Sequence, residues 1–199
     1  LHTPRRRQRQ MCIRDRKKQS ESSEGRLISC SNCTVSPIAI TLYPLMQIAD
    51  ITSVKIATQQ ALSGGGRILL AEGRAGRQIN SEIPGEAESI ITELAKILSC
   101  DFDIEASCER VMRDHGHYAR IEVEFGEPIS AHQVVRAWRE SYSRSQELNL
   151  PSATKRPIIF VDGELDDNHR WVGFEQHKHP GLDLKAAMAV AVGEVEING

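Results

Sequence analysis

The chain has 199 residues and a mass of 22.2 kDa, and 40% of its residues are hydrophobic and 26% charged, a composition that excludes a fully disordered protein. Its apolar runs fall far short of the about 20 residues that a membrane span needs, so we expect no membrane partner. Residues 1–18 hold eight Lys/Arg and one Asp, or 8 − 1 = +7, so with a total of −2 the remainder carries −9, which argues against nucleic acid as the main partner.

Residues 1–25 are basic, rich in Gln and Ser, and lack apolar periodicity. Three interpretations stand: an arm for nucleic acid or a membrane surface, a disordered tail, or an artefact. The string RRRQRQMCIRDR at 5–16 resembles a translated sequencing adapter, which favours the artefact. We therefore expect 1–25 to be a disordered tail outside the fold, and 26–199 to be one domain truncated at both ends.

The apolar pattern changes after residue 26. Pro37 suits the first turn of a helix, and an apolar stretch predicts that helix over 37–47. Residues 50–58 include several β-branched residues and have a period-2 pattern, which predicts a strand that the glycines at 64–66 end. Residues 68–83 are expected to form a long irregular loop. Apolar residues at helical spacing then predict a helix over 86–98.

The second half adds three strands and a helix. Strands are predicted over 104–111 and 119–125, and Ser130 is predicted to cap a helix over 131–142. Residues 158–161 predict another strand, and 186–196 form a final β-rich run. We expect an α+β fold, in which a mixed β-sheet is backed by the helices over 37–47, 86–98 and 131–142; the mixed sheet is what the family resemblance described below implies.

Cys33 lies just before the first predicted helix. A thiol there meets unsatisfied N–H groups and the positive end of the helix dipole, which favours a nucleophilic thiolate. A buried structural cysteine is the alternative. Cys30 and Cys33 form a C-x-x-C pair, but Cys100 and Cys108 supply no second close pair, so no metal site is expected. The irregular cysteine spacing also favours a reducing, cytoplasmic compartment.

Three further groups of residues carry possible chemistry. Arg110 and His117 lie at strand ends, where an arginine could clamp a carboxylate and a histidine could move a proton. With His115, His117 could instead ligate a metal, or both could simply be solvated. The turn at 63–66 is weak evidence for phosphate binding. Glu93 and Lys96, three residues apart on a helix, are usually an exposed ion pair.

Taken together and in order, these segments resemble the aspartate-semialdehyde dehydrogenase family. The resemblance lies in the strings SNCTVSPIAITLYPL, QALSGGG, ITELAKIL, ERVMRDHGHYARIEVEF and LPSATKRPI. It implies a fold like the C-terminal domain of glyceraldehyde-3-phosphate dehydrogenase, which acts as the catalytic and dimerisation domain. It also implies a homodimer, and we expect the apolar faces of strands in 104–125 and 186–196 at or near its interface.

The resemblance further implies a reaction and a set of roles. The family converts L-aspartyl 4-phosphate to L-aspartate 4-semialdehyde with NADP through a cysteine thioester, in lysine, threonine and methionine biosynthesis. The motif positions imply that Cys33 is the nucleophile, Gln60 the amide that positions the acyl group and His117 the acid/base. They imply that Arg110 holds the α-carboxylate, Glu93 the substrate ammonium and Lys96 the phosphate. The turn of Ser63, Gly64 and Gly65 would contact the nicotinamide.

The chain departs from the family pattern in several places. The Pro of Asn-Pro-Asn-Cys is Ser31, the Thr of the Glu-Thr-x-Lys helix is Leu94, and Arg113 adds a charge near the site. No Gly-rich dinucleotide-binding unit precedes residue 27, so we expect the chain alone to be inactive. The alternatives are an enzyme like N-acetylglutamyl-phosphate reductase, which shares the thiol mechanism, and an inactive dimerisation module.

Overall fold

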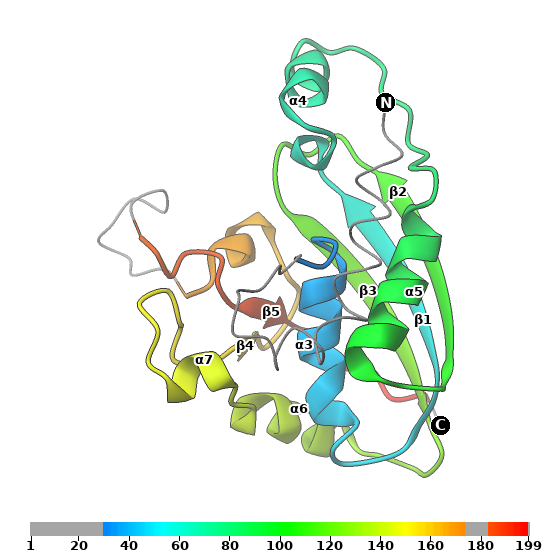
Figure 1. The fold of residues 1–199 in the computed structure, drawn as a ribbon, viewed down its shortest axis with the longest axis vertical. Coiled ribbons are helices and arrows are strands. Elements are labelled where there is room, and N and C mark those ends of the chain that lie inside the picture. The colour runs from blue at the N-terminus through cyan, green and yellow to red at the C-terminus, as the bar shows by residue number, and fades with distance from the viewer. Residues whose placement is uncertain (1–29, 174–182, 199) are drawn as a thin grey trace, which may run out of the picture.

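A three-stranded mixed sheet forms the centre of the fold (Figure 1). The computed structural model describes residues 30–173 and 183–198, so the expectations for 1–25 lie outside the described residues. Strand β1 (Ile51–Gln60) is central, with β2 (Asp103–Arg110) parallel to it on one side and β3 (His117–Phe125) antiparallel on the other. The mixed sheet predicted from the sequence is confirmed.

Two helices, α3 (Val35–Leu45) and α5 (Glu86–Leu98), cover one face of this sheet (Figure 1). Alternate residues of β1 point toward them, because successive strand side chains face opposite sides. The core therefore joins the sheet to both helices, and its fully buried side chains include Ile38, Leu42, Ile90, Leu94 and Val54. Burying each such side chain contributes about 1.5–3 kcal/mol.

The helix α6 (Ala131–Glu140) begins at Ser130 as predicted. The Ser130 side chain accepts from the backbone N–H of Gln133, and the Gln133 side chain accepts from the backbone of Ser130, which makes a capping box. Trp138 then donates its ring N–H to the carbonyl of Thr41 at 3.0 Å. This bond attaches α6 to α3, and the short helix α7 (Arg144–Glu147) follows.

A second, two-stranded parallel sheet pairs β4 (Ile158–Phe160) with β5 (Val190–Val192). The β-rich run expected over 186–196 therefore pairs over three residues only. In the sequence, the 3-10 helix η2 (Asp167–Trp171) lies between β4 and β5. It contacts the loop before β3, where Arg113 forms an ion pair with Asp167 at 3.1 Å. This ion pair joins the second sheet region to the end of the central sheet.

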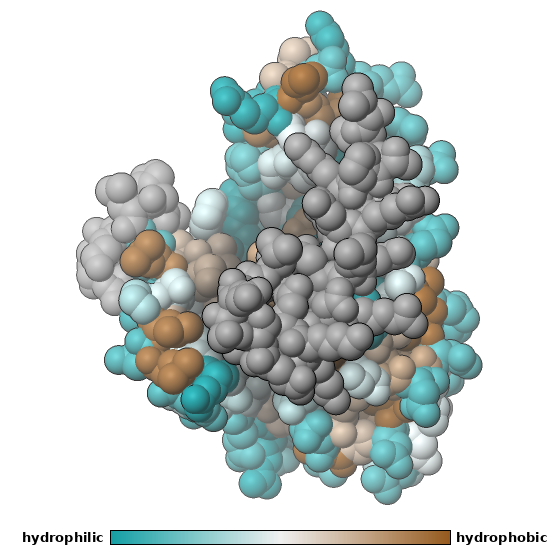
Figure 2. Space-filling model, in the orientation of Figure 1, coloured by the Kyte–Doolittle hydropathy of each residue, from teal (hydrophilic) through white to brown (hydrophobic). Residues whose placement is uncertain are grey.

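The expectation of an irregular loop over 68–83 is wrong at its start. A 3-10 turn, η1 (Leu62–Gly65), leads directly into the helix α4 (Arg67–Arg74). Leu69, Leu70, Ala71 and Glu72 are good helix formers, and Gly73 lets the helix pack directly on Leu62. The helix forms a tip of the molecule, where an apolar patch stands among hydrophilic residues (Figure 2).

Among the described residues, no helix has both the length and the apolar character needed to cross a membrane.

Candidate active site

Arg110, Gln60 and His117 lie side by side at one end of the central sheet. In the strand register, Gln60 is paired with Arg110 on β2 and with His117 on β3. Parallel strands end at the same edge, and an antiparallel neighbour begins there, so two strand ends and one strand start meet. The structure thus brings together three residues that the sequence placed in the site.

The backbone around these residues is connected by hydrogen bonds. The N–H of Leu62 donates to the carbonyl of Arg113 at 2.8 Å, and the N–H of Ser63 donates to that of Asp114 at 3.1 Å. These bonds hold the turn η1 against the loop that leads to His117. Arg110 donates from Nη1 to the carbonyl of Ala61 at 2.8 Å, which fixes its guanidinium beside the same turn.

Glu86, the first residue of α5, is a site residue that the sequence analysis missed. Its Oε1 accepts hydrogen bonds from Nε2 of Gln60 at 2.5 Å and from Nδ2 of Asn32 at 2.7 Å. The positive end of the α5 dipole also favours a carboxylate at this position. The sequence signal was a glutamate after Pro84 and Gly85, which is also what an ordinary helix start looks like.

Cys33 lies in the turn that begins α3. Asn32 shapes this turn: its Oδ1 accepts from the backbone N–H of Thr34 at 3.0 Å, and its carbonyl accepts from the N–H of Val35 at 3.1 Å. The Cys33 residue is exposed. Asn32, the residue before Cys33 in the chain, also donates to the carboxylate of Glu86, which in turn accepts from Gln60. The predicted helix-start position of Cys33 is confirmed.

Glu93 and Lys96 lie further along α5 than Glu86. Glu93 accepts from the backbone N–H of Asn32 at 2.6 Å, which places its carboxylate beside the cysteine turn. Lys96 is 96 − 86 = 10 residues from Glu86, or about 15 Å along the helix axis at 1.5 Å per residue. The structure therefore brings Glu93 to the turn of Cys33, whereas it does not bring Lys96 to the cluster of Gln60, Arg110 and His117.

The surroundings of His117 favour its neutral form. Desolvation by the surrounding protein lowers the pKa of His117 below its usual value of 6.5, and the positive charge of Arg110 lowers it further, while Glu86 works in the opposite direction. The residue keeps an exposed surface, so its imidazole can exchange a proton with a ligand. A histidine that is neutral near pH 7 is suited to act as a general base.

A second thiol lies near this cluster. Burial raises the pKa of Cys108, and the negative charge of Glu86 raises it further. Hydrogen bonds with Thr58 and Gln60 and the positive charge of Arg110 act in the opposite direction but are outweighed. Burial likewise raises the pKa of Cys100. Both thiols are therefore poorer nucleophiles than an ordinary cysteine at neutral pH.

The Gly-rich turn predicted to contact a nicotinamide borders the same cluster. Ser63, Gly64 and Gly65 lie in η1, and Gly64 approaches the side chains of Arg110 and His117. The neighbouring Gly66 has a φ of 93° and nothing within 4 Å of the position of an added Cβ. The turn thus offers exposed backbone that a planar ring could approach closely.

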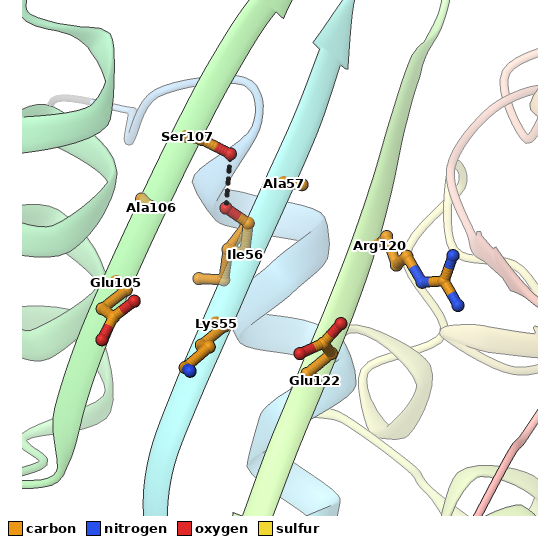
Figure 3. Close-up of a pocket in the computed structure, with 8 residues that line it drawn as sticks. All are labelled: Lys55, Ile56, Ala57, Glu105, Ala106, Ser107, Arg120 and Glu122. Atoms are coloured by element: carbon orange, nitrogen blue, oxygen red, sulfur yellow. Dashed lines mark hydrogen bonds between the residues drawn. The ribbon is translucent and has the colours of Figure 1, made fainter.

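The face of the central sheet that α3 and α5 do not cover carries a shallow groove lined in part by charged side chains (Figure 3). Lys55 of β1 has Glu105 and Glu122 as its register partners on the two neighbouring strands. Arg120 and Ser107 also line the groove, and Ser107 donates to the carbonyl of Ile56 at 3.4 Å. This face therefore presents charged side chains of both signs on neighbouring strands.

No cluster of three or more His, Cys, Asp or Glu residues that could hold a metal occurs in residues 30–173 and 183–198.

Several known proteins are similar in sequence to this chain over most of its length. An aspartate-semialdehyde dehydrogenase of Trichophyton rubrum is 32% identical over 158 residues, which is 72% of this chain and 43% of the relative. The enzyme of the same name from Archaeoglobus fulgidus is 26% identical over 193 residues, which is 92% of this chain and 52% of the relative. This chain is a relative of the aspartate-semialdehyde dehydrogenases. It spans about half the length of the curated relatives that it matches.

A third relative has another name. A malonyl CoA reductase (NADP) of Metallosphaera sedula is 26% identical over 187 residues, which is 85% of this chain and 50% of the relative. No protein-family profile matches the chain. The sequence similarity therefore extends to a reductase that is named for an acyl-CoA substrate.

Solved structures agree on the fold. Aspartate-semialdehyde dehydrogenase with NADP from Candida albicans has a TM-score of 0.62 at 23% identity, over 80% of this chain and 50% of that chain. A probable enzyme of the same name from Pseudomonas aeruginosa has a TM-score of 0.64 at 15% identity, over 92% of this chain and 56% of that chain. The expected α+β fold, like the C-terminal domain of glyceraldehyde-3-phosphate dehydrogenase, is confirmed.

Proposed function

We propose that this chain is the catalytic region of an NADP-dependent aspartate-semialdehyde dehydrogenase, which converts L-aspartyl 4-phosphate to L-aspartate 4-semialdehyde. The observation that carries the proposal is the alignment of Arg110, Gln60 and His117 across three strands, with Glu86 bonded to both Gln60 and Asn32. This arrangement combines a carboxylate clamp, an amide, a base and an acid beside an exposed thiol. The names of the relatives support the same reaction class.

In the proposed acyl-transfer step, the Sγ of Cys33 attacks the acyl carbon. An S–C bond forms while the C–O bond to phosphate breaks, phosphate leaves, and the thiol proton passes to the imidazole of His117. The lowered pKa of His117 keeps that imidazole neutral and able to accept the proton near pH 7. The product of this step is a thioester on Cys33.

The remaining residues bind and orient the substrate. The planar guanidinium of Arg110 matches an α-carboxylate, since its N–H donors form a fork. Glu86 and Glu93 are the two carboxylates beside the cysteine turn that could accept an α-ammonium group. Lys96 stays the proposed phosphate ligand by motif alone, because its place on α5 lies about 15 Å along the helix axis from Glu86.

NADP, when bound, supplies the hydride that reduces the thioester. The turn of Ser63, Gly64 and Gly65 fits a planar nicotinamide, because its backbone is exposed and Gly66 leaves open space beside it. The chain's own part in that step is to hold the thioester on Cys33 next to this turn. The Candida albicans relative was solved with NADP, which supports the same cofactor here.

A homodimer that meets through the open face of the sheet is part of the proposal. The expected apolar interface is not what the strands present, because Ile104, Ile121 and Val123 pack against the core under the helices. The open face instead alternates acids with Lys55 and Arg120. Such a pattern is self-complementary across a twofold axis, where Lys55 of one copy can face a glutamate of the other.

Acylation without cofactor tests the proposed function. The chain is mixed with freshly prepared L-aspartyl 4-phosphate, and phosphate release and the mass added to each cysteine peptide are measured. We expect a hydroxylamine-sensitive adduct on Cys33, no adduct in Cys33→Ser, and an undiminished adduct in the control Cys108→Ser. Acylation at another residue, or none at all, contradicts the proposal.

The malonyl CoA reductase relative gives a second candidate, an acyl-CoA reductase with the same thiol chemistry. The same experiment with malonyl-CoA separates the two. Faster acylation of Cys33 by malonyl-CoA than by L-aspartyl 4-phosphate would favour this second function.

A further inference from the structure

The loop between β2 and β3 is contacted by η2, a helix outside the central sheet. The ion pair of Arg113 with Asp167 is one such contact. In the other, Arg170 donates from Nη1 to the carbonyl of His115 at 3.5 Å, which is long for a hydrogen bond. The loop ends at His117, the first residue of β3, so both contacts act on the backbone just before the proposed base.

The side chain of Arg170 packs directly on Gly116, the residue before His117. A Cβ added to Gly116 would lie 3.4 Å from Cδ and 3.6 Å from Cβ of Arg170. Gly116 has a φ of 90°, a conformation that glycine adopts readily and other residues adopt only with strain. The glycine therefore both forms the turn and lets the stem of Arg170 lie against its main chain.

Packing, more than hydrogen bonding, holds Arg170 in this place. Its guanidinium lies over the ring of Trp171, 5.4 Å from the centroid, which is within the range of a cation–π contact. Its Nε is buried and has no hydrogen-bond partner among the described residues. A buried donor without a partner is unfavourable, so other contacts must keep the side chain there. The contacts with Gly116 and Trp171 are such contacts.

The same loop is held on its other side by η1. The N–H of Leu62 donates to the carbonyl of Arg113 at 2.8 Å. The loop thus lies between η1 and η2, and its last residue leads into the register pair of His117 with Gln60. A shift of the loop would move the imidazole relative to that amide.

We propose that Arg170 is a positioning residue for His117, which fixes the turn at Gly116 and so keeps the imidazole beside Gln60 at the end of the sheet. The inference rests on the proposed function where it takes His117 to be the base, whereas the contact of Arg170 with the turn does not depend on that role. Arg170 itself takes no part in the chemical step. It gives η2, which lies outside the central sheet, a share in the geometry of the site.

The pKa of His117 reports on this positioning. Desolvation is the largest cause of its lowered value, Arg110 of β2 acts in the same direction, and Glu86 of α5 opposes both. Desolvation depends on where the imidazole lies. If the turn is released, water reaches the ring and the pKa rises toward 6.5.

Two substitutions separate packing from charge. Arg170→Ala removes both the stem and the guanidinium, whereas Arg170→Gln removes the charge but keeps most of the stem and an N–H donor. The matched control is Arg139→Ala on α6, because the guanidinium of Arg139 also lies over an aromatic ring, that of Phe160 at 5.2 Å. The pKa of His117 is measured from its ring resonances by NMR, and their loss in His117→Asn assigns them.

We expect Arg170→Ala to raise the pKa of His117 toward 6.5, and Arg170→Gln and Arg139→Ala to leave it nearly unchanged. An unchanged pKa in Arg170→Ala overturns the inference. Equal rises in Arg170→Ala and Arg170→Gln overturn it too, because they would show that Arg170 acts through its charge.

The acylation of Cys33 by L-aspartyl 4-phosphate tests the consequence for the reaction. At pH 7, Arg170→Ala should slow it about tenfold, a part of the roughly 10²–10⁴-fold that a positioned base contributes. An undiminished rate despite a raised pKa of His117 would contradict a role in the chemistry. No acylation of the unsubstituted chain would contradict the proposed function alone, because the titration of His117 does not depend on it.

A further measurement needs no variant, so it holds even if Arg170→Ala fails to fold. Nuclear Overhauser effects between the side-chain protons of Arg170 and the α-protons of Gly116 should be observed in the unsubstituted chain. Their absence would show that Arg170 does not pack on the turn and would overturn the inference.

Discussion

Gln60 and His117 are register partners at the end of the antiparallel pair of β1 and β3, although β2 separates them in the chain. Strand register, rather than a flexible loop, therefore decides how far the amide lies from the imidazole. A slip of one residue would turn His117 to the opposite face of the sheet. The chemistry of this end of the molecule depends on the pairing of the strands.

Cys33 should be a more reactive thiol than Cys100 and Cys108. It is exposed at a helix start, whereas burial raises the pKa of the other two. Iodoacetamide at pH 7, followed by peptide mass mapping over time, should show Cys33 modified at least tenfold faster than either. Faster modification of Cys108 would remove the support for Cys33 as nucleophile.

Glu86 should matter more than Glu93 for binding the substrate ammonium. Glu86 accepts a hydrogen bond from the side chain of Gln60, which lines the site, whereas Glu93 accepts one from the backbone N–H of Asn32. Glu86→Gln should weaken the protection of Cys33 by L-aspartate about tenfold, which corresponds to about 1.4 kcal/mol. The matched change Glu93→Gln serves as the comparison, and a larger effect there would assign the ammonium to Glu93.

The stability of the fold should fall as the pH drops below 6.5. The pKa of His117 is lowered in the folded chain, so the unfolded chain takes up its proton first as the pH falls through the usual value of 6.5. The unfolded state then binds more protons, and the free energy of unfolding decreases until the lowered folded pKa is passed. In urea unfolding at pH 5 and pH 7, His117→Asn should show a smaller difference than the unsubstituted chain. An unchanged difference would mean that other groups carry the pH dependence.

Leu94 should be a main support of the fold. It is 0% exposed on α5, in the cluster that joins this helix to α3 and β1, whereas Ile97 on the same helix is 41% exposed. Leu94→Ala should cost about 2–5 kcal/mol of unfolding free energy, because it removes buried methyl groups and leaves a cavity. Ile97→Ala is the control and should cost much less, as measured by urea unfolding. Similar losses for both would show that α5 is less firmly packed than its burial indicates.

The proposed dimer should depend on Lys55. Its register partners are Glu105 and Glu122, so Lys55→Glu would place three acids side by side on the open face. Sedimentation at low salt should show that the dissociation constant of the dimer rises at least tenfold. The same substitution at the exposed Lys155, outside the sheet, should leave the dimer intact. A monomer in the unsubstituted chain at tens of micromolar would refute a dimer through this face.

Local patterns in the sequence were enough to predict the helix over 86–98 and the capping of α6 by Ser130. Apolar spacing and capping residues act between near neighbours, so both can be read without the fold. The same holds for Cys33 at the start of α3. The helix α4 was missed although residues 69–72 favour a helix, because Gly73 and Gly76 indicated a loop; in the structure Gly73 lies directly on the side chain of Leu62.

The sequence by itself determined which residue types could do the chemistry, since the order of its motifs named Cys33, Gln60, Arg110 and His117. Only the tertiary structure decided which of them meet. The register of three strands aligned Gln60 with Arg110 and His117, and the packing of α5 brought Glu86 to Gln60 while the 1.5 Å rise per residue carried Lys96 about 15 Å further on. Distances between residues far apart in the chain come from strand pairing and helix packing, which no local pattern encodes.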